Sequence, residues 1–208
     1  MNIILMGCPG AGKGTQSARL QSAYNLQHIS TGDLLRAEMA SGSALGKQVA
    51  EVINGGNLVS DELMISMLET RVKASDKGII FDGFPRTVAQ AQALEIMLQK
   101  YNRSITSVIM IDLPEEEVVK RLSSRRLCKK CGRPAATITQ PVCACGGELY
   151  VRADDAPESV KHRLEVYRKD TLPVKNYYQH SGKYVEINGH QTPDQVFEDI
   201  CSVLEKVK

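Results

Sequence analysis

Residues 3–15 read IILMGCPGAGKGT and decide the fold, because a short apolar run enters a glycine-rich loop and a helical pattern follows directly. A strand, a loop and a helix in this order form a phosphate-binding unit. Glycines let backbone N–H groups approach phosphate oxygens closely, and the helix directs its positive end at the same anion. Lys13 adds an ammonium group that can follow a transferred phosphoryl group.

The loop satisfies the pattern G-x-x-x-x-G-K-[ST] at Gly7, Gly12 and Lys13 but has Gly14 where Ser or Thr is usual. Thr15 brings a hydroxyl one position later, so the pattern does not establish direct binding of Mg²⁺ by this hydroxyl. An ordinary glycine turn before a helix is the alternative reading. The matching strand and helix on the two sides of the loop argue against it.

The chain of 208 residues has the length of one domain, or of one core with insertions. Its formal net charge of +2 argues against a large surface for nucleic acid or for a membrane. No secretory signal pattern is visible, and no apolar run reaches the ~18 residues that a membrane span needs. We therefore expect a cytoplasmic protein that binds neither nucleic acid nor membrane.

Short β-type runs alternate with helical stretches, which is typical of an α/β fold with a parallel, doubly wound sheet. The expected strands are residues 3–6, 26–29, 79–81, 107–111 and 184–187. The expected strands lead into Gly7, Ser30, Asp82 and Asp112. Because functional sites of such folds lie at the carboxyl ends of strands, these residues can face one crevice.

Two stretches interrupt this alternation. Residues 31–74 are too long for a single crossover, so part of them should form a small helical flap. Residues 126–155 contain cysteines, glycines and prolines without a helical period. We expect a core at residues 1–29, 60–123 and 156–208, a flap at 30–59 and a lid at 124–155.

Asp82 ends an apolar strand, and a carboxylate in this position can hold Mg²⁺ through water, because Mg²⁺ gives up its hydration shell reluctantly. A helix cap or a turn is the alternative role. Proline then fixes the turn 82–87, DGFPRT, which holds Arg86 at the mouth of the crevice, and Thr87 can cap the next helix. Gln90 follows one helical turn later and could read a base edge beside a phosphate held by Arg86.

Arginines recur at the expected crevice. Arg36 lies one turn into a helix after the second strand, where it could hold an anion. The alternative for Arg36 is a solvated surface arginine. The alternative for Asp33, in the same motif, is to cap this helix. Arg121 and Arg125 lie four residues apart, on one face of the helix expected before the lid, and Arg152 and Arg163 follow the lid. Lid closure would bring these four cations together around a highly charged transition state.

The alternative for each lid arginine is an ion pair within a helix, for instance between Glu117 and Arg121, which would stabilise the fold by only ~0.3–0.5 kcal/mol.

A phosphate acceptor is already an anion and needs no general base. The histidines accordingly show no catalytic pattern, and we interpret them as structural or surface residues: His28, His162, His180 and His190.

Four cysteines lie in the lid, at Cys128, Cys131, Cys143 and Cys145. Two pairs about a dozen residues apart predict a tetrahedral Zn²⁺ site, which would order a loop that is poor in apolar residues. The second pair is C-x-C where C-x-x-C is usual, and free thiols or a redox pair are the alternatives. Cys8 and Cys201 lie in apolar surroundings and read as small core residues.

Four motifs in order resemble the adenylate kinases of the bacterial type with a long lid: residues 7–15, 30–36 (STGDLLR), 82–87 and 152–155 (RADD). The resemblance covers essentially the whole chain. It implies a P-loop core with a doubly wound parallel five-stranded sheet, a helical nucleoside-monophosphate-binding insertion and a metal-stapled lid. It also implies the reaction Mg·ATP + AMP ⇌ 2 ADP in a monomer, with these nucleotides as the only partners.

The resemblance further implies roles for individual residues. Those that bind ATP would be Gly10, Ala11, Gly12, Lys13, Gly14, Thr15, Arg121 and Gln191. Those that bind AMP would be Thr31, Arg36, Asn57, Leu58, Val59, Gly83, Phe84, Pro85, Arg86, Gln90, Arg152 and Arg163. The catalytic cations would be Lys13, Arg86, Arg121, Arg125, Arg152 and Arg163.

One departure from the family pattern lies in the lid, where Arg133-Pro134-Ala135 replaces a hydroxyl and an aromatic residue that often contact the ATP ribose. Two other functions stay open. The first is a nucleoside monophosphate kinase that prefers another base, although Thr31 and Gln90 favour AMP. The second is a zinc-ribbon binding module that uses the P-loop only as a nucleotide switch.

Overall fold

The computed structural model describes residues 1–54, 57–135, 137 and 139–207. Gly55 and Gly56 of the expected flap, Ala136 and Ile138 of the expected lid, and Lys208 of the expected core lie outside the described residues. The remainder forms one α/β core with two insertions, as the sequence predicted.

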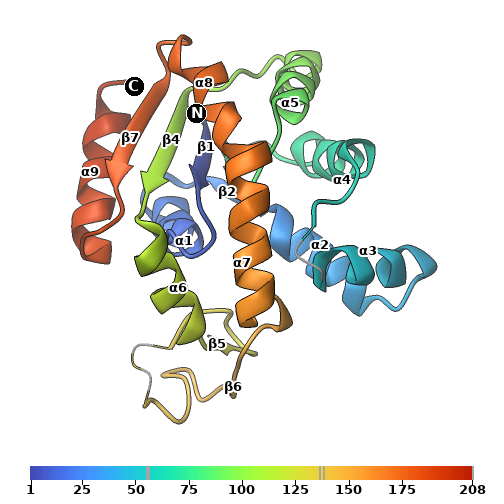
Figure 1. Ribbon diagram of the computed structural model, residues 1–208. Helices are drawn as coiled ribbons and strands as arrows, with labels where there is room; N and C mark the ends of the chain where they lie inside the picture. The colour runs from blue at the N-terminus through green and yellow to red at the C-terminus, as the bar shows by residue number, and fades with distance from the viewer. Residues whose placement is uncertain (55–56, 136, 138, 208) are drawn as a thin grey trace.

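The core is a parallel five-stranded sheet in the order β2-β3-β1-β4-β7 (Figure 1). Its strands are β1 Asn2–Gly7, β2 Gln27–Ser30, β3 Ile79–Asp82, β4 Ser107–Asp112 and β7 Tyr184–Asn188. All five predicted strands are confirmed. Every residue of β1 and β3 is buried, which explains their unbroken apolar runs, since helices cover both faces of a doubly wound sheet.

The two faces of β1 define two cores. Ile4 and Met6 pack with the first set of helices, α4 Asp61–Lys73, α5 Val88–Lys100 and α8 Leu172–Gln179. Ile3 and Leu5 pack with the second set, α1 Lys13–Tyr24, α6 Glu115–Ser123, α7 Pro157–Val166 and α9 Pro193–Glu205. A π-helical turn, Tyr167–Thr171, joins α7 to α8. The alternation of side chains along one central strand thus organises both layers.

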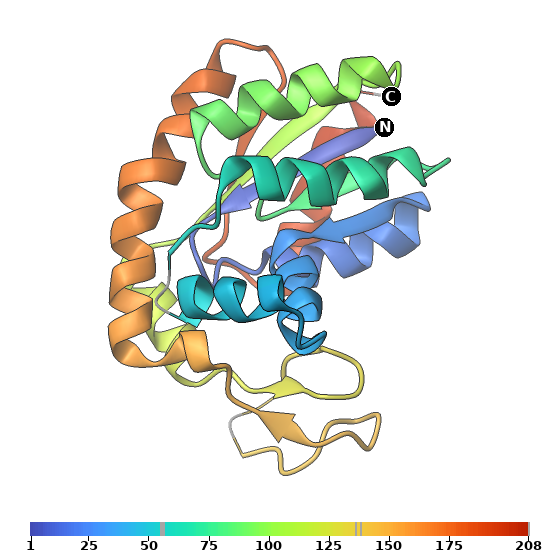
Figure 2. The same cartoon turned by 90° about the vertical axis from the view of Figure 1, so that its right-hand side faces the viewer.

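The first insertion contains α2 Thr31–Ala40 and α3 Ala44–Asn54, which pack on each other at one edge of the core (Figure 2). The prediction of a helical flap is therefore confirmed. The capping alternative for Asp33 is wrong, because Ser30 caps α2: its side chain accepts a hydrogen bond from Asp33 N at 3.2 Å. Asp33 pairs instead with Arg36.

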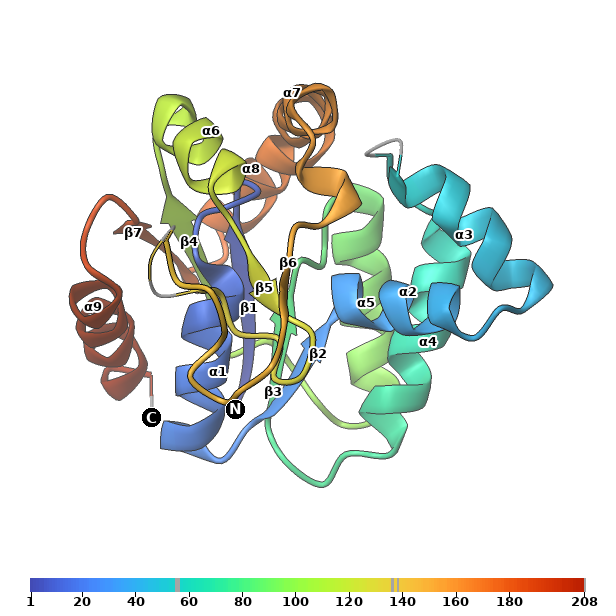
Figure 3. The ribbon, with the colours of Figure 1, turned by 90° about the horizontal axis from the view of Figure 1, so that it is seen from below.

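The second insertion leaves the core after α6 and returns at α7. It contains the antiparallel pair β5 Leu127–Cys128 and β6 Leu149–Tyr150, and it ends in a 3₁₀ turn, Ala153–Asp155. Figure 3 shows both strands in front of the sheet, with the flap helices to one side. The expectation that Arg125 shares a helix face with Arg121 is wrong, because α6 ends at Ser123 and Arg125 lies on the segment beyond it.

No helix among the described residues is long and apolar enough to cross a lipid bilayer.

The two faces of α5 give a direct test of the core. Leu94 is fully buried, whereas Ile96 on the same helix is 61% exposed. We expect Leu94→Ala to lower the free energy of unfolding by about 2–5 kcal/mol, because it leaves a cavity between α5 and the sheet. Ile96→Ala is the matched control and should change it by about 0.5 kcal/mol or less. Urea unfolding measures both values, and equal losses would contradict the packing described here.

Candidate functional site

A cleft of about 1400 Å³ opens at the carboxyl edge of the sheet, between the glycine-rich loop, the flap and the lid. Ser30 and Asp82, at the ends of β2 and β3, line it. Asp112, at the end of β4, is exposed and lies outside it, contrary to the expectation that it could face the same crevice. Gly7, at the end of β1, is also absent from the lining, which begins at Pro9 of the loop that follows it.

The structure brings most of the predicted nucleotide-binding residues to this cleft. Those that line it are Gly10, Ala11, Gly12, Lys13, Gly14, Thr15, Thr31, Arg36, Asn57, Leu58, Val59, Asp82, Gly83, Phe84, Arg86, Gln90, Arg121, Arg125, Arg152, Arg163 and Gln191. Pro85 is buried behind the lining, next to a cis peptide bond with Phe84. Segments that are distant in the sequence thus meet in one place.

Glycines are required in the loop for two different reasons. At Gly7 the backbone has a φ of +147°, and a Cβ atom would lie 2.6 Å from the Ile111 carbonyl oxygen of the neighbouring strand. Gly12 has a φ of +96° and precedes the first residue of α1. A side chain at either position would strain the backbone, so the loop holds its shape at the N-terminus of α1.

The ammonium group of Lys13 is hydrogen-bonded to backbone carbonyls. Its Nζ donates hydrogen bonds to the carbonyl oxygens of Gly7, at 2.8 Å, and Cys8, at 2.9 Å. Desolvation in the cleft lowers the pKa of Lys13, partly offset by the negative charge of Asp82. Within the described part of the chain no carboxylate lies within ion-pair distance of this ammonium, so its charge is available to a bound anion.

Asp82 faces the loop helix. Its Oδ2 accepts a hydrogen bond from Ser17 Oγ at 3.4 Å and lies 3.1 Å from His28 Nε2, and a Cβ added at Gly14 would be 3.8 Å from it. These partners belong to α1 and β2, which argues against the alternative of a helix cap or a turn aspartate. The sequence led us to interpret His28 as a structural or surface residue and did not predict its contact with Asp82. The one signal was its position on the strand that leads to Ser30.

The turn after β3 is fixed by two donors to one carbonyl. Thr31 Oγ1 donates to Gly83 O at 3.0 Å, and Arg86 Nε donates to the same oxygen at 2.8 Å. Desolvation, followed by the nearby charge of Arg163, lowers the pKa of Arg86 to about 10. Arg86 is thereby held at the cleft as a desolvated cation, in the position that the turn sequence predicted.

Gln90 lies at the start of α5, which Thr87 caps as predicted by accepting a hydrogen bond from Gln90 N at 3.1 Å. Both ends of its side-chain amide are engaged. Gln90 Oε1 accepts from Arg86 N at 2.7 Å, and Gln90 Nε2 donates to Asp61 Oδ1 at 2.6 Å. Asp61 was not predicted, because an acidic residue in the first turn of a helix usually serves only the helix dipole.

Two of the arginines beside the lid, Arg125 and Arg163, form ion pairs with aspartates. Arg125 makes a bidentate pair with Asp155, at 2.8 and 2.5 Å, and Arg163 contacts Asp154 at 3.0 Å and Asp155 at 3.3 Å. The Asp155 side chain is fully buried. One carboxylate thus joins the entry of the lid to its exit, although sequence analysis had noted Asp154 and Asp155 only as part of a motif.

Arg121 and Arg152 have different surroundings from Arg125 and Arg163. Arg121 does contact Glu117 at 3.2 Å, as the alternative reading held, and it also donates to Gly189 O at 3.1 Å. Arg152 Nε is buried and has no hydrogen-bond partner among the described residues. Desolvation and the charges of Arg36 and Arg125 lower the pKa of Arg152. A cation in this state would be stabilised by an anion entering the cleft.

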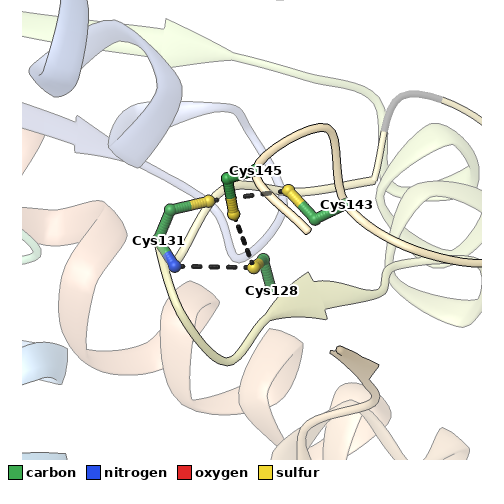
Figure 4. A group of neighbouring side chains, drawn as sticks. All are labelled: Cys128, Cys131, Cys143 and Cys145. Atoms are coloured by element: carbon green, nitrogen blue, oxygen red, sulfur yellow. Dashed lines mark hydrogen bonds between the residues drawn. The ribbon is translucent and has the colours of Figure 1, made fainter. Parts of the chain in front are cut away.

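The four lid cysteines form one cluster, in which all Sγ atoms lie within 4.8 Å of one another (Figure 4). Cys128 and Cys145 are 3.5 Å apart, and Cys131 and Cys143 are 3.6 Å apart. A tetrahedron with Zn–S bonds of ~2.3 Å has sulfur–sulfur edges of about 3.8 Å, so the spacing fits a zinc ion. The thiols are not paired in disulfides.

Two further features of the cluster suit a metal. Cys128 Sγ accepts hydrogen bonds from the N–H groups of Cys131, at 3.4 Å, and Lys130, at 3.3 Å, and these bonds lower the pKa of Cys128 to about 6. A Cβ at Gly147 would lie 2.4 Å from Cys128 Sγ, so glycine leaves the space around the sulfurs open. Thiolate is the form that binds zinc.

Comparison with known proteins identifies the family of the chain. The family model "Adenylate kinase" matches residues 5–183. The adenylate kinase of Archaeoglobus fulgidus is 45% identical over 216 residues, covering 100% of both chains. That of a Geobacillus species is 47% identical over 212 residues and 98% of both chains, and that of Thermodesulfovibrio yellowstonii is 42% identical over 214 residues, 99% of this chain and 100% of the relative. The chain therefore belongs to the adenylate kinase family.

Proposed function

We propose that the chain catalyses reversible phosphoryl transfer from Mg·ATP to AMP and gives two ADP. One observation carries this proposal: Lys13 of the loop, Arg86 of the acceptor side and Arg163 of the lid hinge are close enough that each arginine lowers the pKa of Lys13. Three cations from three parts of one cleft would meet where two polyphosphates exchange a phosphoryl group.

In the reaction an oxygen of the AMP phosphate forms a bond to the γ-phosphorus of ATP. The bond from that phosphorus to the bridging oxygen breaks, and its electron pair leaves with ADP. The acceptor oxygen is already an anion, so no side chain has to remove a proton, which agrees with the lack of a catalytic histidine in the proposed set. The side chains contribute position and positive charge.

The cleft divides into a donor and an acceptor side. On the donor side, backbone N–H groups of residues 10–15 and the N-terminus of α1 would hold the ATP phosphates, with Arg121 and Gln191 towards the adenosine. On the acceptor side, Arg36, Arg86 and Gln90 would hold AMP, together with Thr31, Asn57, Leu58, Val59, Gly83, Phe84 and Pro85. Arg125, Arg152 and Arg163 would act where the phosphates meet.

The cations can offset the repulsion between the two nucleotides. At an effective dielectric constant of about 20, one pair of unit charges ~4 Å apart is worth ~4 kcal/mol. Asp82 would hold Mg²⁺ through water, and its placement beside Gly14 and Ser17 fits that role. When bound, Mg²⁺ neutralises charge on the β- and γ-phosphates of ATP.

We also propose that the flap, residues 30–59, and the lid, residues 124–155, move relative to the core when nucleotides bind. Closure would exclude water and strengthen the charge interactions in the cleft. A structural Zn²⁺ bound to Cys128, Cys131, Cys143 and Cys145 would keep the lid folded during this motion. We also propose that the chain works as a monomer, since all the described residues that line the cleft come from one copy. Its proposed location is the cytoplasm, as the sequence led us to expect.

Replacing Lys13 tests the function. We expect wild-type chain to convert Mg·ATP and AMP into ADP, and Lys13→Ala to lower kcat at least a hundredfold, by about 2.7 kcal/mol of transition-state stabilisation. The melting temperature should change little, because Lys13 bonds only to two carbonyls. Lys100→Ala, an exposed lysine of α5, is the control and should keep full activity. An unchanged kcat in Lys13→Ala would refute the role of the loop.

The metal site is tested by Gly147→Ala. We expect about one zinc per wild-type chain by elemental analysis, and less in Gly147→Ala, because the added Cβ would meet Cys128 Sγ at 2.4 Å. Gly132→Ala is the control for backbone strain without a clash, since Gly132 has a φ of +69° but a Cβ there meets nothing within 4 Å. Removing zinc with a chelator should lower the melting temperature and leave phosphoryl transfer measurable. Identical melting with and without the metal would contradict a structural role.

A further inference from the structure

The side-chain amide of Gln90 has only one permitted orientation. Gln90 is 2% exposed, and its amide lies between Arg86 N and the Asp61 carboxylate. A backbone N–H can only donate, so the atom facing it at 2.7 Å must be Oε1. A carboxylate can only accept, so the atom facing it at 2.6 Å must be Nε2. A flip of the amide would place donor against donor and acceptor against acceptor.

These two bonds leave one position free on each atom. Nε2 keeps a second hydrogen and Oε1 a second lone pair, and Gln90 lines the cleft. A fixed amide can therefore offer one donor and one acceptor to a base edge. Adenine complements it with a ring nitrogen that accepts beside a 6-amino group that donates. On the same edge a 6-oxo purine has an N–H and a carbonyl, which reverses both roles.

We infer that Asp61 is a positioning residue that sets the specificity for the acceptor base: by fixing the Gln90 amide it favours a 6-amino over a 6-oxo purine monophosphate. The inference rests on the proposed function. Asp61 acts through Gln90 and touches no nucleotide. Asp61 lies outside every motif identified in the sequence.

The position of Asp61 suits this role. It is the first residue of α4, and Ser60 caps that helix by accepting a hydrogen bond from Leu63 N at 3.4 Å. Helix α4 packs against α5, which carries Gln90. Met64 and Leu68 of α4 and Leu94 of α5 share one buried core. The carboxylate and the amide are thus held by two helices that pack on each other.

The test compares AMP with inosine monophosphate, which differs from AMP in having the 6-oxo group. We expect Asp61→Asn to lower the AMP-to-IMP ratio of kcat/KM about tenfold, because an asparagine at residue 61 can face either end of the amide and leaves only the Arg86 N–H to favour one orientation of Gln90. Glu62→Gln is the matched control. It removes a carboxylate from the same helical turn, at an exposed position, and should leave the ratio unchanged.

The readout separates specificity from stability. A purely structural role of Asp61 would lower kcat/KM for AMP and IMP by the same factor, and an unchanged ratio in Asp61→Asn would overturn the inference. If Glu62→Gln lowered the AMP-to-IMP ratio of kcat/KM as much as Asp61→Asn does, the inference would be overturned as well, because Glu62 makes no contact with the Gln90 amide among the contacts described. A wild-type chain that phosphorylates neither nucleotide would instead refute the proposed function itself.

Discussion

Holding a positive charge in a deep cleft, away from bulk water, costs free energy unless an anion neutralises it, and Lys13 and Arg86 are held in this way. Among the described residues both side chains donate hydrogen bonds to backbone carbonyls, and both have a lowered pKa because the cleft desolvates them. The fold maintains this state with rigid backbone: a glycine loop against β4 and a turn fixed by Thr31. Nucleotide phosphates would supply the missing negative charge, so the same constraint that destabilises the empty cleft favours substrate binding.

The carboxylates near the cleft are placed where they hold the architecture and leave Lys13 and Arg86 unpaired. Asp155 is fully buried and joins Arg125 to Arg163, which lie on the two sides of the lid. Breaking a buried pair of this kind typically costs 3–5 kcal/mol, because it leaves a charge without a partner. The hinge arginines are therefore fixed in position before any nucleotide arrives. Arg152 Nε has no hydrogen-bond partner among the described residues, so an incoming phosphate could supply one.

Patterns of neighbouring residues were enough to predict the strands and helices of the core. The contacts that the sequence did not predict join residues that are distant along the chain. The run from Ile3 to Thr15 specifies strand, loop and helix within a few residues, so its prediction needed no partner from elsewhere in the chain. Asp33 and Ser30 compete for the same helix cap, and propensity alone could not choose between them. The bonds of Asp61 to Gln90 and of His28 to Asp82 join residues that are distant in the sequence. Only the packing of α4 on α5 and of β2 on β3 reveals them.

The most direct measurement of the central claim is a competition assay in which Mg·ATP meets equal concentrations of AMP, GMP, UMP and CMP, with all products separated and quantified. The account predicts that AMP is consumed first and that two ADP form for each AMP. Preferential formation of GDP, UDP or CDP would contradict the assignment of the acceptor side. Binding of ATP without transfer to any monophosphate would contradict the catalytic role of the cleft.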